Sequence, residues 1–243
     1  MGSIYREYCN NKSFEERFQK PSSVSKETHI VLAFARDYDE EDRHTNGIYR
    51  EFFDKNVTPQ LIADFKKNFP SDSVVKFFLC IGNCSEKYPF HITDKARWIT
   101  NATRSLQHII QHYGFDGIDV YYTRSHINAN DSVDAIGKDG LQVLRRAVPH
   151  RNCEYFDYVV YQTHDDVHHN IPLNDPQDVI TIFNDLVSNH NYPKEKLLVG
   201  HSILPKDWDT APYPVILTAL PKLIKDGTIQ GTSVWAITDD DQP

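Results

Sequence analysis

The stretch GFDGIDVYYTRS, residues 114–125, places polar side chains at alternate positions of a predicted strand. Successive side chains of a strand point to opposite faces, so Asp119, Tyr121 and Thr123 share one face. A carboxyl group there is either positioned for chemistry or buried and held by hydrogen bonds from the backbone or from tyrosines. The residues alone leave both interpretations of Asp119 open.

Short apolar runs rich in β-branched and aromatic residues predict the strands that must position these side chains. The clear runs cover residues 28–35, 74–82, 116–122, 155–162, 196–203 and 231–238, and a weaker one covers residues 4–8. Amphipathic helices are predicted between several of them, over residues 58–69, 93–113, 175–190 and 214–227. Strands that alternate with helices in this order indicate a parallel sheet.

Cap residues mark the ends of the predicted helices. Thr93 or Asp94 can cap the start of the longest helix, and Gly114 can end it. Its apolar face is expected to consist of Ile99, Ala102, Leu106, Ile109, Ile110 and Tyr113. Pro176 lies near the first position of the 175–190 helix.

The same pattern fits an open doubly wound sheet and a closed eight-stranded barrel. No GxGxxG or GxxxxGK[ST] motif follows a predicted strand, which favours the barrel. Residues 142–147 are interpreted as a further strand, and a helix over residues 135–147 is the alternative. We therefore expect one domain over residues 1–243, an α/β TIM (β/α)8 barrel that is trimmed around strands 4 and 5 and lacks a full final helix.

Composition limits the partners. The formal net charge of -8 disfavours nucleic acid and anionic membrane surfaces, so a neutral sugar or another small polar ligand is the expected partner. The chain shows no apolar leader or membrane span, which predicts a cytoplasmic protein. Four scattered cysteines are expected to be reduced, and no cofactor is expected. The sequence does not predict an oligomeric state.

Asp116, Gly117 and Asp119 resemble the D-G-x-D-x-D-x-E motif of the family 18 glycoside hydrolases, the chitinases. The segments SVVKFFLCIGN, DYVVYQ and SVWAITDD are similar to that family's third, sixth and eighth strands. The segments IYREY and THIVLAFA and the helix RWITNATRSLQHIIQHY resemble the plant chitinase-like branch that contains narbonin and the RuBisCO-associated protein. The resemblance implies a TIM barrel.

The resemblance also implies that the chemistry is lost. In the family, the glutamate that ends the motif protonates the glycosidic oxygen, and Thr123 stands at that position. Loss of a general acid typically costs roughly 10²–10⁴-fold in rate. Tyr121 replaces the aspartate that orients the substrate's acetamido group. Asp116, Asp119, Tyr121 and Thr123 are therefore expected to be vestigial, with no catalytic residue by the family mechanism.

A ligand site is still predicted at the mouth of the barrel. The resemblance places Trp235 at the floor of the sugar site, although barrel core is an equally open interpretation of this tryptophan. The full expected binding set is Tyr8, Asp119, Tyr121, Tyr161, Gln162 and Trp235.

Two charged segments follow predicted strands. The cluster QTHDDVHHN after the sixth strand predicts metal ligands at His164 and His168, with a solvated loop as the alternative. The run from Arg36 to Arg43 is interpreted as a solvated loop. Three functions follow as hypotheses: a catalytically silent binding protein, a storage protein, or an enzyme of different chemistry that reuses the barrel mouth.

Overall fold

A computed structural model describes residues 3–18, 25–83, 87–89, 91–122, 157–164, 173–189, 192–207 and 211–237 of the protein. The strand expected at residues 142–147 and its helical alternative at 135–147 lie outside these residues, as do Thr123 and His168. None of the helices in the described ranges is long and apolar enough to span a membrane.

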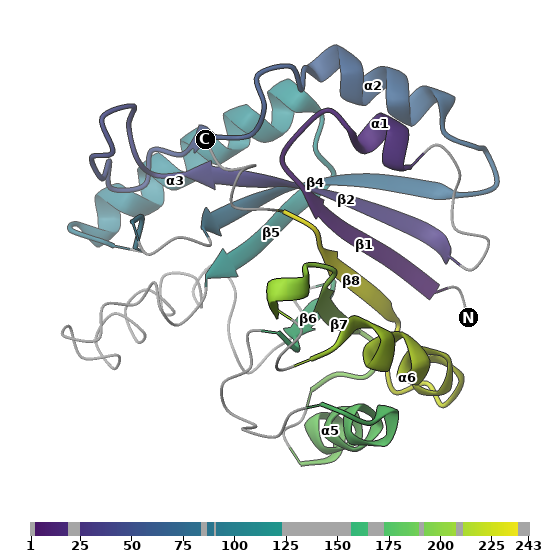
Figure 1. Cartoon of the computed structure of the whole chain (residues 1–243). Helices are drawn as coiled ribbons and strands as arrows, with labels where there is room; N and C mark the ends of the chain where they lie inside the picture. Colours follow the sequence, from purple (N-terminus) through teal and green to yellow (C-terminus); the bar gives the residue numbers. More distant parts are fainter. Residues whose placement is uncertain are drawn as a thin grey trace.

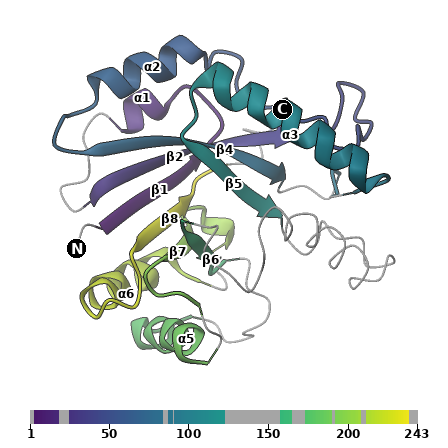
Figure 2. The same ribbon diagram turned by 180° about the vertical axis from the view of Figure 1, so that it is seen from behind.

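One curled sheet organises the molecule (Figure 1 and Figure 2). In the described part of the chain its parallel strands follow the order β5, β4, β2, β1, β8, β7, β6, and a short β3 pairs antiparallel with β2. The first and last strands are therefore neighbours, as a barrel requires and an open doubly wound sheet does not. The strands are β1 (Ser3–Cys9), β2 (Ser25–Arg36), β3 (Arg50–Glu51), β4 (Val74–Asn83), β5 (Gly117–Tyr122), β6 (Val159–Gln162), β7 (Leu197–Ser202) and β8 (Gly231–Trp235).

The helices lie on the outer side of the curled sheet. Both ribbon views show α1, α2 and α3 beside β1, β2, β4 and β5, whereas α5 and α6 accompany β6, β7 and β8 (Figure 1 and Figure 2). Their bounds are α1 (Phe14–Arg17), α2 (Pro59–Asn68), α3 (Lys95–Tyr113), α5 (Pro176–Ser188) and α6 (Tyr213–Lys225), with a 3₁₀ turn η3 (Pro205–Asp207). The α/β barrel-type fold predicted from the sequence is confirmed.

The predicted caps of α3 are also confirmed. The Asp94 side chain accepts a hydrogen bond from the backbone N–H of Arg97, and Gly114 ends the helix in the left-handed conformation with φ of 68°. Ala102, Leu106 and Ile109 are buried as expected, together with Trp98. Ile99 was wrongly assigned to the buried face, since 40% of it is exposed.

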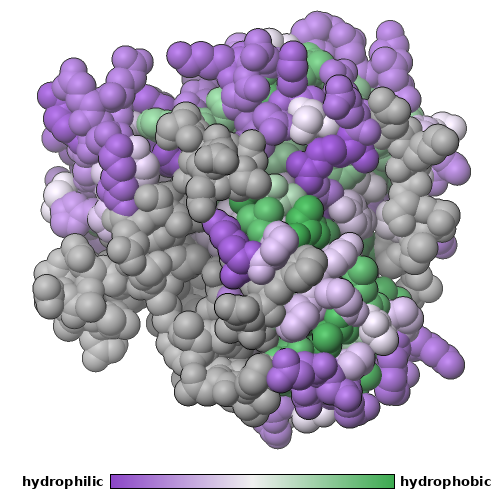
Figure 3. All heavy atoms as spheres, viewed as in Figure 1, coloured by the Kyte–Doolittle hydropathy of each residue, from purple (hydrophilic) through white to green (hydrophobic). Residues whose placement is uncertain are grey.

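Three apolar clusters hold the layers together. Outward side chains of β1, β2 and β4 pack against α1, α2 and α3, and outward side chains of β7 pack against α5 and α6. A third cluster lies on the inner face of the sheet and contains residues of β1, β2, β4, β5 and β8. On the molecular face in Figure 3, hydrophilic residues cover most of the upper region, and apolar residues are visible towards the centre.

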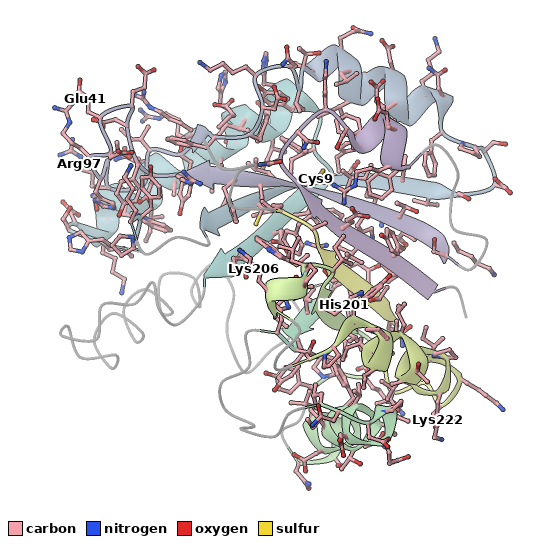
Figure 4. The ribbon with its side chains drawn as sticks, in the orientation of Figure 1. Cys9, Glu41, Arg97, His201, Lys206 and Lys222 are labelled. Atoms are coloured by element: carbon pink, nitrogen blue, oxygen red, sulfur yellow. The ribbon has the colours of Figure 1, made fainter. Side chains whose placement is uncertain are left out.

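Two histidines are buried in separate halves of the sheet. His29 of β2 is fully buried on the inner face, and burial lowers its pKa to about 4. His201 of β7 lies in the half built from β6, β7, β8, α5 and α6 (Figure 4). Its ring stacks on Tyr213 at a centroid distance of 5.3 Å, and burial lowers its pKa to about 4. Both side chains are therefore held neutral in the folded protein.

This burial predicts loss of stability in mild acid. Because the folded-state pKa of each histidine lies below its ordinary value of 6.5, the unfolded chain binds more protons as the pH falls from 6.5 towards 4. The free energy of unfolding should fall by about 2 kcal/mol per histidine between pH 7 and pH 5. Urea titrations at pH 7 and pH 5 should show a smaller fall in the free energy of unfolding for His201→Gln than for the wild type. The exposed His91→Gln is the control, and an equal fall in both variants would refute the assignment.

Candidate functional site

Four of the predicted site residues meet on the inner face of the sheet. Tyr8 of β1, Asp119 and Tyr121 of β5 and Trp235 of β8 are all buried, and each exposes less than a tenth of its surface. The inward direction of Asp119 and Tyr121 is the one that the strand periodicity predicts. These residues therefore form one cluster, although they come from three separate segments of the chain.

Asp119 is surrounded by donors. Its Oδ1 atom accepts hydrogen bonds from Nη2 of Arg6, with which it forms a salt bridge, and from the Tyr8 hydroxyl at 3.2 Å. Its Oδ2 atom accepts from the Cys80 thiol, with 2.9 Å between sulfur and oxygen. Three side chains thus engage both carboxylate oxygens, which matches the hydrogen-bonded interpretation of this aspartate.

Arg6 is the partner that sequence analysis missed. It lies two positions before Tyr8 on β1, which puts both side chains on the inner face, and only 3% of it is exposed. Burial opposes its charge, but the attraction of Asp119 prevails and raises the pKa of Arg6. The guanidinium carbon also lies 4.8 Å from the ring centroid of Phe78. The alternation of side chains along β1 could have identified Arg6, because residues two apart in a strand face the same side.

A polar chain leads from Arg6 to the surface. Nη1 of Arg6 lies 3.4 Å from Nδ1 of His29, and Nε2 of His29 lies 2.8 Å from Oε1 of Glu27. Glu27 forms a salt bridge with Lys76, 2.5 Å from oxygen to nitrogen. Burial alone would raise the pKa of Glu27, but hydrogen bonds from Lys76 and His29 lower it. The buried ion pair is therefore connected to charges at the rim of the sheet.

Tyr8 is a donor in this arrangement. Burial and the neighbouring charge of Asp119 raise the pKa of Tyr8 well above its ordinary value of 10. The phenol consequently keeps its proton at neutral pH and is unsuited to act as a general base.

An aromatic stack covers the predicted sugar floor. The ring of Tyr121 lies parallel to the Trp235 indole, with centroids 5.0 Å apart and an interplanar angle of 20°. Tyr8 and Phe34 flank the same indole at 5.2 and 6.3 Å. Trp235 itself is only 6% exposed. Of the two interpretations left open by the sequence, the geometry favours barrel core for this tryptophan.

Other predicted residues do not join the cluster. Oδ2 of Asp116 accepts from the Phe77 backbone N–H at 2.8 Å and pairs with Lys66 Nζ at 2.6 Å, which fastens the start of β5 to β4 and α2. Tyr161 was wrongly placed with the inner residues. Its ring packs against Phe183 of α5, with the ring centroids 5.7 Å apart. Tyr161 and Gln162 are adjacent in β6, so their side chains point to opposite faces of the sheet.

Gln162, the next residue of β6, takes the inner direction. Gly200, its register partner on β7, leaves the space for the amide: a Cβ atom at Gly200 would lie 2.2 Å from Oε1 of Gln162. The predicted metal ligands are only half described. His164 lies 6.5 Å from the Trp235 ring, His168 is outside the described residues, and no group of three metal-ligating side chains occurs in the described ranges.

The charged segment after β2 differs from the solvated loop that was predicted. Arg36 and Asp37 are each only 3% exposed. Oδ2 of Asp37 accepts from Trp98 Nε1, His44 Nε2 and the Gly47 backbone N–H at 3.0–3.2 Å. The beginning of this loop is thus an internal anchor between β2 and α3, while Glu40 and Glu41 are exposed.

Comparison with known proteins finds similar sequences and solved structures of the same fold. No family model matches the chain. The chain is 27% identical to the RuBisCO-associated protein of Glycine max over 264 residues, which cover 97% of this chain and 91% of that protein. It is 31% identical to Chitinase 1 of Tulipa saxatilis subsp. bakeri over 142 residues, 56% of this chain and 44% of that protein.

Two solved structures share the fold. The catalytic domain of a family GH18 chitinase from the fern Peteris ryukyuensis superimposes with a TM-score of 0.71 at 22% identity, over 98% of this chain and 92% of that domain. The family 18 chitinase of Crocus vernus gives 0.70 at 21% identity, over 96% and 92%. The chain is therefore similar to plant chitinase-like proteins over most of its length, and it shares the fold of the family 18 glycoside hydrolases.

Proposed function

We propose that this chain is a catalytically inactive chitinase-like protein that acts by binding. The proposal rests on the hydrogen bonds of Asp119. Its carboxylate oxygens already accept from Arg6, Tyr8 and Cys80. A carboxylate that is ion-paired with arginine and accepts two further hydrogen bonds has no proton to donate and little remaining capacity to accept from a substrate. Asp119, one of three residues that match the family motif, thus supports the fold.

The neighbouring substitution supports the same conclusion. Tyr121 removes the carboxylate that the family uses to orient the acetamido group, and its ring also covers one face of Trp235. A sugar ring needs such a face for stacking. Tyr121 therefore opposes both positioning and binding of a chitin unit in the barrel interior.

A binding role suits the rest of the molecule. The net charge of -8 continues to argue against nucleic acid and membranes, and a cytoplasmic location remains part of the proposal. The relative from Glycine max is named for its association with RuBisCO and aligns over nearly the whole chain. We infer that a protein partner is a better candidate ligand than a chitin oligosaccharide, and that storage remains a second candidate role.

An enzyme of different chemistry is less well supported. It would use Asp119 and Tyr121 as an acid and base pair or would bind a metal with His164 and His168. Among the described residues, Asp119 is ion-paired and Tyr121 is buried in the aromatic stack. Both groups are therefore engaged in packing and hydrogen bonding instead of facing a substrate.

The first test of the proposal is hydrolysis. The wild-type protein should release no product from chitotetraose, because Thr123 replaces the acid and Arg6 neutralises Asp119. Tyr121→Asp combined with Thr123→Glu should remain at least about 10²-fold slower than a family 18 chitinase assayed in parallel. Turnover by the wild type that Asp119→Ala abolishes would overturn the proposal.

Arg6→Met, added as a third substitution, tests whether Arg6 keeps Asp119 from taking part in hydrolysis. If Arg6 withholds Asp119 from chemistry, adding Arg6→Met to the Tyr121→Asp, Thr123→Glu variant should increase its residual rate. Circular dichroism verifies that the triple variant is folded. An unchanged rate in a folded triple variant would show that Arg6 is not the block.

The buried ion pair should contribute strongly to stability. Asp119→Ala leaves a buried guanidinium without its counter-ion, which should lower the free energy of unfolding by about 3–5 kcal/mol. The double variant Arg6→Met, Asp119→Leu should recover most of this loss, because the pair is then replaced by apolar side chains. Lys222→Ala, which breaks the exposed Lys222–Asp226 pair, is the matched control and should change stability by at most about 0.5 kcal/mol. A small effect of Asp119→Ala would contradict a structural role.

Trp235 offers a separate test of the interior. As a core residue, Trp235→Ala should cost about 3–5 kcal/mol in urea unfolding. Calorimetric titration of the wild type with N-acetylglucosamine oligomers should give no binding heat. Measurable heat from the wild type, lost in a Trp235→Ala variant of unchanged stability, would restore the sugar-floor interpretation.

A further inference from the structure

Two histidines on α3 form a pair outside the barrel interior. His108 and His112 are one helical turn apart, and both side chains are exposed. Their imidazole rings are nearly parallel, with an interplanar angle of 12° and centroids 6.1 Å apart. Within the described ranges, no hydrogen bond engages the ring nitrogens of either residue. Both imidazoles are therefore available as ligands from the same side of one helix.

The spacing suits a chelate. Residues four apart project from the same helix face, and the H-E-x-x-H helices of zinc enzymes hold one ion with this separation. Late transition ions bind imidazole nitrogen at about 2.0–2.1 Å. Since both side chains are exposed, rotation about their side-chain bonds can direct one nitrogen of each ring to a shared ion without moving the backbone.

The electrostatic setting favours a cation at this position. His112 lies in the last turn of α3, where the partial negative charge of the helix carboxyl end attracts positive ions. The net charge of -8 adds a general attraction. Arg104, one turn before His108, repels a cation at this site, but both charges are exposed and are screened by water and salt.

We propose that His108 and His112 form a surface chelating site for a late first-row divalent ion, with Cu²⁺ bound more tightly than Ni²⁺ or Zn²⁺. The protein supplies two imidazole nitrogens, and water completes the coordination. The site shares no residue with the barrel interior or with the His164 and His168 pair. It goes beyond the proposed binding function, which can fail or hold independently of it.

Copper titration of the whole chain tests the site. Calorimetry with Cu²⁺ in a weakly coordinating buffer near pH 7.5 should reveal one micromolar site on the wild type. His112→Gln should weaken that site by at least about tenfold, because the second contact of a chelate is intramolecular. Electron paramagnetic resonance should detect two coordinated nitrogens in the wild type and one in the variant. His91→Gln, an exposed histidine elsewhere, should leave the affinity unchanged.

A rescue variant tests the spacing itself. Adding Arg104→His to His112→Gln places a new histidine four residues before His108 and should restore the two-nitrogen signal and most of the affinity. Circular dichroism verifies that α3 is intact in each variant. Copper affinity unchanged in His108→Gln, His112→Gln would assign the ion to other residues and overturn the proposal. A folded rescue variant that regains neither signal nor affinity would overturn it as well.

Discussion

The interior of this barrel depends on one buried charge pair, Arg6 with Asp119. Removing two ions from water costs several kcal/mol per ion, and the cost is offset only when the pair is well hydrogen-bonded. Here Tyr8 and Cys80 also donate to the carboxylate, and the guanidinium rests against the ring of Phe78. The two partners come from β1 and β5, which are separated in the sheet by β2 and β4. The Arg6–Asp119 ion pair therefore spans the concave face of the sheet and stabilises its curvature.

Tyr8 couples this polar centre to the aromatic layer. Its hydroxyl donates to Asp119, while its ring lies beside both Tyr121 and Trp235. Ion pair and stack are thus parts of one packed unit. A substitution in either part should disturb the other, because interior packing is close to that of a crystal and leaves little room for independent adjustment.

Most regular elements could be predicted from the sequence, because each strand is a short apolar run and each long helix has an amphipathic stripe. The short elements α1 and β3 were missed, since a few residues carry no detectable period. Asp119 and Tyr121 were correctly oriented by strand alternation. Tyr161 was wrongly expected on the inner face. Its place at the end of β6 suggested a site residue, but the alternation of side chains along the strand puts Gln162 rather than Tyr161 on that face.

The partners of the buried charges could not be predicted. Arg6 and Asp119 lie 113 residues apart, and nothing in the local pattern of β1 states which charge will face it. The burial of Asp37 depends in the same way on donors from His44, Gly47 and Trp98, which the fold assembles. A charged run is solvated unless such donors converge on it, and convergence is a property of the fold.

The stack of Tyr121 on Trp235 has a consequence for how such sequences change over time. Once a tyrosine ring packs against the indole, the tryptophan is required for a filled interior, and selection for a stable fold alone is sufficient to retain it. An aspartate at position 121 would leave a hole beside Trp235 and would place a second carboxylate near Asp119. A variant with aspartate at position 121 would therefore be a less stable protein, and the presence of Trp235 in a chain is not by itself evidence of a sugar site.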